Sequence, residues 1–485
     1  MSEQSSRSLV LASRRPSCHL TVPGLPKHTV TTKVAQMAVL SPRCVTSRKS
    51  WPVLGALVSL LAVHHIWTSG FCQRAASVRP EREKEYDLTI NDRLACEDLP
   101  GANETLVVLR TGSTELEAKL SVHLNTTLRC YPNRLIFSDS KCTYGEENII
   151  DALETVSTKI KEEHPDFSLY RRLRSHGRDA LTADEVHGIS GGKFEESWTG
   201  HQENSGWKLD KWKFLPMVNR TLHEFPSMKW YVFVEADTYI LWSSLLQYLT
   251  ALDPKVPYYS GVRVFINDVG FAHGGSGFIV SQPAMNRVVD HYNKHRLEFE
   301  NFTDSHWAGD CVLGKAFSEA GVKLTDAWPI IQGDHPGIVP YFGPDGRPAP
   351  PVDKRIWCSD TVSYHHVQPD VIRDLWRFEQ ERLQPQLRPL QHREIFEEFI
   401  LEHMNDSRHD WDNESSKVVG IATDFDTCRT FCERDMQCLQ YSLNVDGECR
   451  HFDLPRLGGA STKGVRSGWM NSRIRHRMAA LPPCD

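Results

Sequence analysis

The stretch that decides the fold is Trp-Tyr-Val-Phe-Val-Glu-Ala-Asp-Thr-Tyr, residues 230–239. Its first five residues are apolar without alternation, which is typical of a parallel-sheet strand covered on both faces. Glu235 and Asp237 follow at the carboxyl end of this strand, where open α/β sheets place their ligand crevice. Two carboxylates one residue apart can hold a hard divalent cation, which in turn neutralises a diphosphate. The alternative is a solvated acidic turn.

The segments around this strand alternate between strand and helix patterns. The apolar residues 106–109 are followed by Arg110-Thr111-Gly112, and the apolar residues 135–137 are followed by Ser138-Asp139-Ser140. Residues 118–128, between these two strand patterns, predict a helix. Further along, the chain predicts helices at 152–163, 206–214 and 243–252, and a strand at 258–265. This alternation predicts an α/β fold with a parallel sheet.

Charge is nearly balanced over the 485 residues, with 56 basic and 62 acidic side chains, and this argues against a nucleic-acid binder. The N-terminus departs from the balance. Residues 1–50 carry eight Lys or Arg and one acid, and residues 51–67 are free of charged side chains. Extended to residue 71, this run reaches the roughly 20 residues of a membrane span. The basic flank then keeps 1–50 in the cytosol and sends the rest into the lumen.

We therefore expect a single-pass type II anchor at 51–71, with a cleavable signal peptide or a buried core helix as alternatives. Either Met1 or Met37 is the start. Two features favour a lumenal body: ten cysteines beyond residue 90, and Asn-x-Ser/Thr sequons that all follow the anchor. The sequons begin at Asn103, Asn125, Asn219, Asn301, Asn405 and Asn413.

Composition predicts the domain boundaries. Residues 72–95 are charged and read as a stem, 405–417 as a polar linker, and 476–485 as a tail. Between linker and tail, 418–475 form a module small enough to need disulfides, with Cys428, Cys432, Cys438 and Cys449. Cys130 and Cys142 bracket the second predicted strand and could close a short loop.

Three further segments carry groups suited to chemistry. Residues 273–280 form a glycine-rich turn before a strand, which either admits a substrate or is only a tight turn. Asp310 lies at a predicted helix start, as a general base or as an N-cap. His365 and His366 end a short apolar strand, as metal ligands or as a structural pair.

Taken in order over about 106–375, these segments resemble the inverting glycosyltransferases of family 31, the core 1 β1,3-galactosyltransferase and Fringe-like group, in its fungal type. The resemblance implies a GT-A, Rossmann-like domain over 96–404. It also implies transfer of a hexose, galactose in the first place, from a UDP-sugar to a glycan or glycoprotein acceptor in β1,3 linkage. The expected location is the Golgi membrane.

The same resemblance assigns roles to residues of this chain. Asp310 matches the catalytic base, and Asp237 and His365 match the ligands of a divalent cation, expected to be Mn²⁺. Glu235 stands where the family usually has Asp, so it reaches the metal directly or through water. The expected cofactor contacts are Arg110, Thr111, Asp139, Lys208, Lys211, Glu235 and Gly275. For Lys208 and Lys211 the alternative is a pair of solvated helix lysines.

The cysteine module resembles a PAN/Apple domain and ends in Ser467-Gly468-Trp469. Such domains bind protein or carbohydrate, and the alternative is a purely stabilising spacer. Three other functions stay open: Fringe-like N-acetylglucosaminyl transfer, a catalytically silent carbohydrate-binding membrane protein, and a secreted matrix or adhesion protein whose anchor is cleaved.

Overall fold

The predicted strand after residue 230 is β5 (Trp230–Glu235), and it lies inside an eight-stranded mixed sheet. The computed structural model describes residues 94–190, 204–342, 356–383, 388–404, 407–461, 463–481 and 483–484. The predicted tail 1–50, anchor 51–71 and nearly all of the stem lie outside these residues. Among the residues that are described, no helix is long and apolar enough to cross a membrane.

The sheet runs in the order β11-β7-β10-β5-β1-β2-β4-β3. β1 (Thr105–Arg110) lies parallel to both β5 and β2 (Arg134–Ser138). β10 (Phe278–Ser281) is antiparallel to β5. The other strands are β3 (Cys142–Tyr144), β4 (Glu147–Asp151), β7 (Tyr259–Gly261) and β11 (Leu324–Asp326). The expected parallel core is confirmed. β5 lies in the interior of the sheet, because β1 pairs with one of its edges and β10 with the other.

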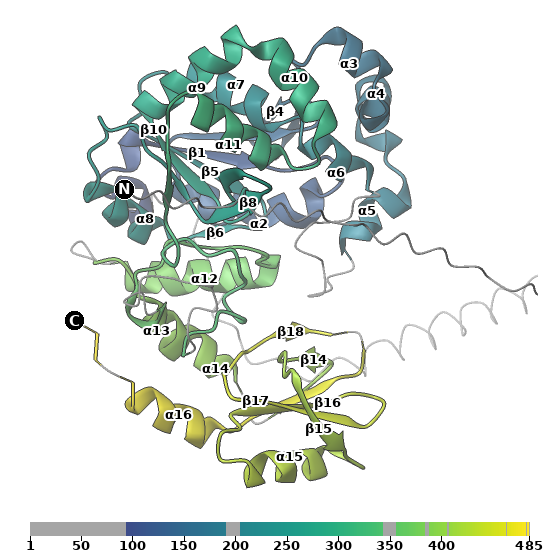
Figure 1. Cartoon of the computed structure of the whole chain (residues 1–485), viewed down its shortest axis with the longest axis vertical. Helices are drawn as coiled ribbons and strands as arrows, with labels where there is room; N and C mark the ends of the chain where they lie inside the picture. Colours follow the sequence, from purple (N-terminus) through teal and green to yellow (C-terminus); the bar gives the residue numbers. More distant parts are fainter. Residues whose placement is uncertain are drawn as a thin grey trace, which may run out of the picture. The chain divides into compact units, whose positions relative to one another are not determined.

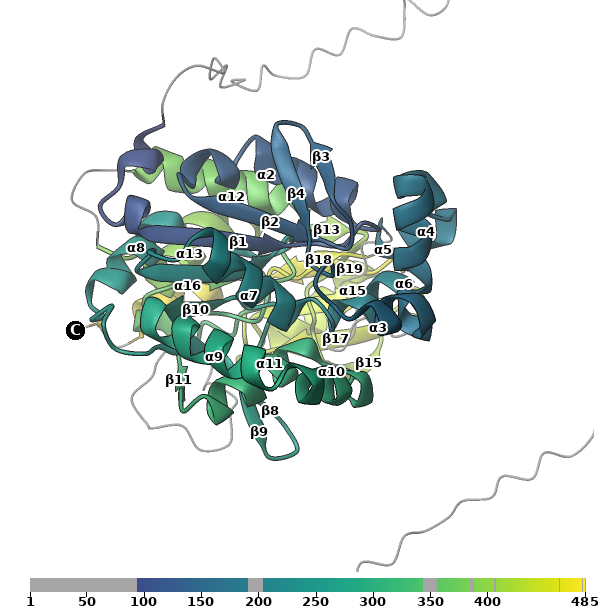
Figure 2. The same cartoon turned by 90° about the horizontal axis from the view of Figure 1, so that it is seen from above.

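Helices cover both faces of this sheet because alternate residues of its central strands are apolar on each side (Figures 1 and 2). Leu106 and Val108 face a layer made by α7 (Phe214–Glu224), α9 (Gln282–Lys294) and α11 (Gly309–Glu319). Val107 and Leu109 face a layer that includes α2 (Ser121–Leu124), α8 (Trp242–Thr250) and α12 (Pro369–Arg382).

Seven further α-helices of the described residues belong to the same part of the chain. They are α3 (Thr158–Glu163), α4 (Ser168–His176), α5 (Ala183–Ser190), α6 (Ser205–Asp210), α10 (Arg296–Ser305), α13 (His392–Ile395) and α14 (Leu401–His403). The helix expected at 152–163 is confirmed only over α3, because strand β4 ends at Asp151 and turns follow it. The strand expected at 258–265 is divided into β7 and β8 (Arg263–Ile266), and β8 forms a hairpin with β9 (Val269–Ala272).

The cysteine-rich module is a five-stranded antiparallel sheet in the order β13-β19-β16-β17-β15. Its strands are β13 (Ser407–His409), β15 (Lys417–Ile421), β16 (Gln440–Leu443), β17 (Glu448–Phe452) and β19 (Arg466–Trp469). β14 (Trp411–Asp412) pairs with β18 (Gly459–Ala460), and α15 (Phe425–Arg434) and α16 (Asn471–Ala479) complete the module. Residues 407–412, expected in a linker, therefore belong to the module as β13 and β14.

Within the described residues, four disulfides join Cys96–Cys130, Cys358–Cys484, Cys428–Cys449 and Cys432–Cys438. The loop suggested between Cys130 and Cys142 is wrong: Cys130 pairs with Cys96, and Cys142 is free. Cys484 ties the segment expected to be a tail back to Cys358, across 126 residues of sequence.

Candidate functional site

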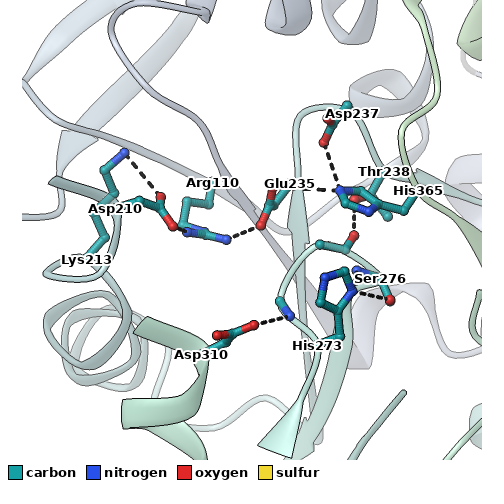
Figure 3. A network of polar contacts seen from close by, with 12 residues as sticks. Arg110, Asp210, Lys213, Glu235, Asp237, Thr238, His273, Ser276, Asp310 and His365 are labelled. Atoms are coloured by element: carbon teal, nitrogen blue, oxygen red, sulfur yellow. Dashed lines mark hydrogen bonds and ion pairs between the residues drawn. The ribbon is translucent and has the colours of Figure 1, made fainter. Parts of the chain in front are cut away.

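The carboxyl ends of β1 and β5 bring a cation and an anion together. Arg110 and Glu235 are paired residues in the register of the two parallel strands. The guanidinium of Arg110 donates to Glu235 Oε1 and, through its other terminal nitrogen, to Asp210 (Figure 3). Arg110 also lies over the ring of Phe214, 4.0 Å from its centroid. Arg110 is thus a buried cation held by two carboxylates and an aromatic face.

A short strand pair places the second acid beside the histidines. β6 (Tyr239–Ile240) pairs with β12 (Ser363–Tyr364), and Val367 N–H donates to the carbonyl of Asp237 at 2.9 Å. Ligand atoms of Asp237, His365 and His366 consequently lie within 4.8 Å of one another. His365 Nε2 is 3.4 Å from Asp237 Oδ1 and 3.9 Å from Glu235 Oε2.

The electrostatics of this cluster favour ionised acids. Burial alone favours the neutral acid, but the charge of Arg110 and the nearby imidazole of His365 lower the pKa of Glu235 to about 2. Asp237 is half-buried, yet Lys119 and His365 hold its pKa well below the ordinary value. The pKa of His365 rises to about 9 because the charges of Asp237 and Glu235 outweigh burial. Burial and the charge of His365 lower the pKa of His366 to about 4.

Two side chains from the connection between β1 and β2 contact the segment 235–237. Lys119 lies just before α2, and His123 lies within it. Lys119 Nζ lies 3.0 Å from Asp237 Oδ2 and 3.0 Å from Glu115. The buried ring of His123 contacts the carbonyl of Ala236 at 2.8 Å and Thr127 Oγ1 at 2.7 Å. Sequence reasoning did not single out Lys119 or His123, because both come from the helical connection between β1 and β2.

The glycine-rich turn lies against the histidine. A Cβ on Gly275 would be 2.2 Å from His365 Cε1, so only glycine leaves room for this imidazole. The carbonyl of Gly275 accepts a hydrogen bond from Thr238 Oγ1 at 2.6 Å. The turn also contains His273, whose Nδ1 contacts Ser276 Oγ at 2.7 Å, and burial with the charge of His365 lowers its pKa to about 3.

Asp310 lies in the first turn of α11, next to the glycine-rich turn. Its Oδ2 accepts from Gly274 N–H at 2.9 Å, and its Oδ1 from Cys311 N–H at 2.9 Å (Figure 3). Burial raises its pKa to about 6, although those two N–H groups and Arg110 favour the ionised form. A carboxyl that titrates near neutrality is suited to accept a proton.

These groups line one pocket of about 240 Å³. Its lining includes the charged or hydrogen-bonding side chains of Arg110, Glu115, Lys119, Asn204, Asp210, Lys211, Lys213, Glu235, Asp237, His273, Asp310, His365 and His366. Gly275 lines it as well, along with Trp207, Trp307 and Phe214.

Three of the residues expected to contact a nucleotide do not line this pocket: Thr111, Asp139 and Lys208. Asp139 is fully buried, 2.5 Å from Lys213 Nζ, and accepts from Ser113 N–H at 2.8 Å. Lys213 also donates to the carbonyl of Thr111 at 3.1 Å. The tips of β1 and β2 are therefore fastened to each other and to α7 by an internal ion pair. Lys211 lines the pocket while its ammonium pairs with Asp166 at 3.0 Å.

The donors present fit a divalent cation. Asp237 Oδ1 and His365 Nδ1 are buried without a hydrogen-bond partner among the described residues. One carboxylate and two imidazoles are ligands that a divalent transition metal accepts, and three protein ligands leave coordination positions for other groups. Glu235 lies beside this group and is held by Arg110. A second cluster consists of Cys432, Cys438 and His451. Its two cysteines form a disulfide with each other, so neither offers a free thiolate to a metal.

A scan of the sequence against models of known protein families finds no match.

Proposed function

We propose that the protein is an inverting, metal-dependent glycosyltransferase that moves a hexose from a UDP-sugar to a glycan hydroxyl in β1,3 linkage. One observation carries the proposal: a single pocket contains a possible cation site, Asp237, His365 and His366, and a separate half-buried carboxyl, Asp310, with a pKa of about 6. A mixed α/β sheet with its ligand pocket at the strand ends supports the finer proposal of a GT-A domain.

In this proposal the two sides of the pocket have different tasks. Asp237, His365 and His366 would hold Mn²⁺, which would supply positive charge against the UDP diphosphate. Asp310 accepts the proton of the acceptor hydroxyl as its oxygen bonds to the anomeric carbon. The bond from that carbon to the diphosphate oxygen breaks on the opposite face, and its electron pair leaves with UDP. One displacement inverts the anomeric centre.

Arg110 supports this division of tasks. Its guanidinium lies between Glu235 and Asp210 and contributes to the ionised form of Asp310. We infer that Glu235 fixes Arg110 instead of ligating the cation directly. The longer Glu side chain suits this role because it reaches across to the neighbouring strand. The choice of galactose, the Golgi location, the membrane anchor and ligand binding by the PAN/Apple-like module are proposals that rest on the sequence alone.

The test is release of UDP by the full-length protein from UDP-galactose, UDP-glucose and UDP-N-acetylglucosamine, with and without Mn²⁺ and simple acceptor glycosides. We expect Mn²⁺-dependent transfer from one donor. Asp310→Asn should keep UDP binding and lower transfer by about 10²–10⁴-fold, the range for loss of a general base. Asp290→Asn, an exposed acid on α9 outside the pocket, is the matched control.

Asp237→Ala tests the cation site separately and should abolish Mn²⁺-dependent UDP binding. Wild-type turnover in Asp310→Asn would remove Asp310 as the base. Folded wild-type protein that binds no UDP-sugar in the presence of Mn²⁺ would contradict the enzyme and favour the silent carbohydrate-binding protein.

A further inference from the structure

Two tryptophans form an apolar surface in a pocket that is otherwise mainly charged. Trp207 is in α6, and Trp307 is in the loop before α11. Their rings are nearly parallel, with planes 11° apart and centroids 6.3 Å apart. This separation exceeds the roughly 4 Å of two rings in full face-to-face contact. The rings therefore leave part of each other's faces uncovered, and the Trp307 side chain is 44 % exposed.

Hydrogen bonds and close packing fix the backbone segments that carry the two tryptophans. Asn204 caps α6 by accepting from Gly206 N–H at 2.7 Å, and His306 Nδ1 accepts from Ala308 N–H at 3.1 Å. The next residue, Gly309, packs directly on the segment after α6. A Cβ there would lie 2.4 Å from Phe214 Cδ2 and 2.7 Å from Lys211 Cα. The Trp307 loop is thus fastened to the segment that carries Trp207, which is the arrangement of a preformed binding surface.

The chemistry of such a surface matches one face of a sugar ring. A pyranose has a face of C–H groups that packs on an aromatic ring, while its hydroxyls point outward to polar partners. In the same pocket lie the carboxylates of Asp210 and Asp310, which accept hydrogen bonds from hydroxyls. The position of Trp307 along the chain favours the acceptor sugar as the occupant of this surface. Trp307 precedes Asp310 by three residues, and the base must contact the acceptor hydroxyl. The cation site, at Asp237 and His365, comes from other elements.

We propose that Trp307, with Trp207 beside it, is the platform on which a pyranose ring of the acceptor glycan stacks. This inference rests on the proposed transferase function and adds the residues that recognise its acceptor. A nucleobase of the donor is the competing occupant of the same aromatic surface, because every base has a face that stacks on aromatic side chains.

The experiment compares the full-length wild type with Trp307→Ala, Trp307→Phe and Trp207→Ala. The control is Phe265→Ala, which removes a 64 % exposed aromatic ring outside the pocket. Methyl glycosides of galactose, glucose and the two N-acetylhexosamines serve as acceptors, because they bring no aromatic group of their own. Acceptor KM and donor KM are measured separately, and saturation-transfer NMR records which glycoside protons touch the protein.

We expect Trp307→Ala to raise the acceptor KM at least about tenfold, which corresponds to about 1.4 kcal/mol. Trp307→Phe should recover most of the loss, and Phe265→Ala should change nothing. The donor KM should stay within about twofold. Saturation transfer to C–H protons of one sugar face should be present in the wild type and weak in Trp307→Ala.

An unchanged acceptor KM in folded Trp307→Ala would refute the platform while leaving the transferase intact. A raised donor KM with an unchanged acceptor KM would assign the rings to the nucleobase. If the wild type turns over no donor, the proposed function fails. The NMR measurement still decides the platform in that case. Saturation transfer to a glycoside that disappears in Trp307→Ala supports the platform, and its absence from the wild type overturns it.

Discussion

Replacing Gly275 with alanine should displace His365, a ligand of the proposed cation site, without changing the histidine itself. The added Cβ would lie 2.2 Å from His365 Cε1 and 2.4 Å from its Nε2, whereas ordinary contact begins at 3.4 Å. The imidazole must therefore retreat by about 1.2 Å, and the ring is buried beside Asp237. Ligand distances in metal sites hold within about 0.2 Å. A shift of this size removes His365 from any cation shared with Asp237.

The expected result is a loss of Mn²⁺ affinity of about 10–100-fold, the range seen when the support of a ligand is removed. The assay titrates the full-length protein with Mn²⁺ and follows free Mn²⁺ by electron paramagnetic resonance. Gly112→Ala is the matched control, because Gly112 lines the same pocket and its added Cβ would meet nothing closer than 3.5 Å. Thermal unfolding shows whether both variants fold. A folded Gly275→Ala protein with wild-type Mn²⁺ affinity would refute His365 as a ligand.

Three other predictions concern protonation, crosslinking and modification. Because the pKa of Asp310 is raised to about 6, its ionised form is lost as pH falls below 6. The value of kcat/KM for the acceptor should then drop about tenfold per pH unit. A flat profile down to pH 4 would contradict the role of Asp310 as the base. Cys484→Ser opens the Cys358–Cys484 bridge and should lower the free energy of unfolding by about 2–4 kcal/mol in thermal or denaturant unfolding, whereas Cys142→Ser, at a free thiol, should change it little. Asn413 is fully buried and donates to two backbone carbonyls at 3.2 Å, so glycopeptide mapping should find it unmodified despite its sequon; a glycan there would contradict this burial.

Local sequence patterns were sufficient for the main elements near the site. The unbroken apolar run of β5 predicts burial on both faces, and its acids follow at the carboxyl end, as the structure has them. Asp310 was expected at a helix start and lies in the first turn of α11. These features depend on neighbouring residues, so the sequence alone carries them. The glycine-rich turn could also be recognised in the sequence. The need for glycine at position 275 could not, because the His365 ring that Gly275 accommodates is 90 residues away along the chain.

Only the tertiary structure decided which charged groups face the pocket. Arg110 and Asp139 both stood at strand tips, yet Arg110 lines the pocket and Asp139 is buried against Lys213. The aromatic pair of Trp207 and Trp307 likewise comes from segments 100 residues apart. The chain by itself determined the order of strands and helices and the residue types at their ends. The partner of each charge was set by packing between distant segments, because the cost of burying an ion depends on what lies within a few ångströms in space.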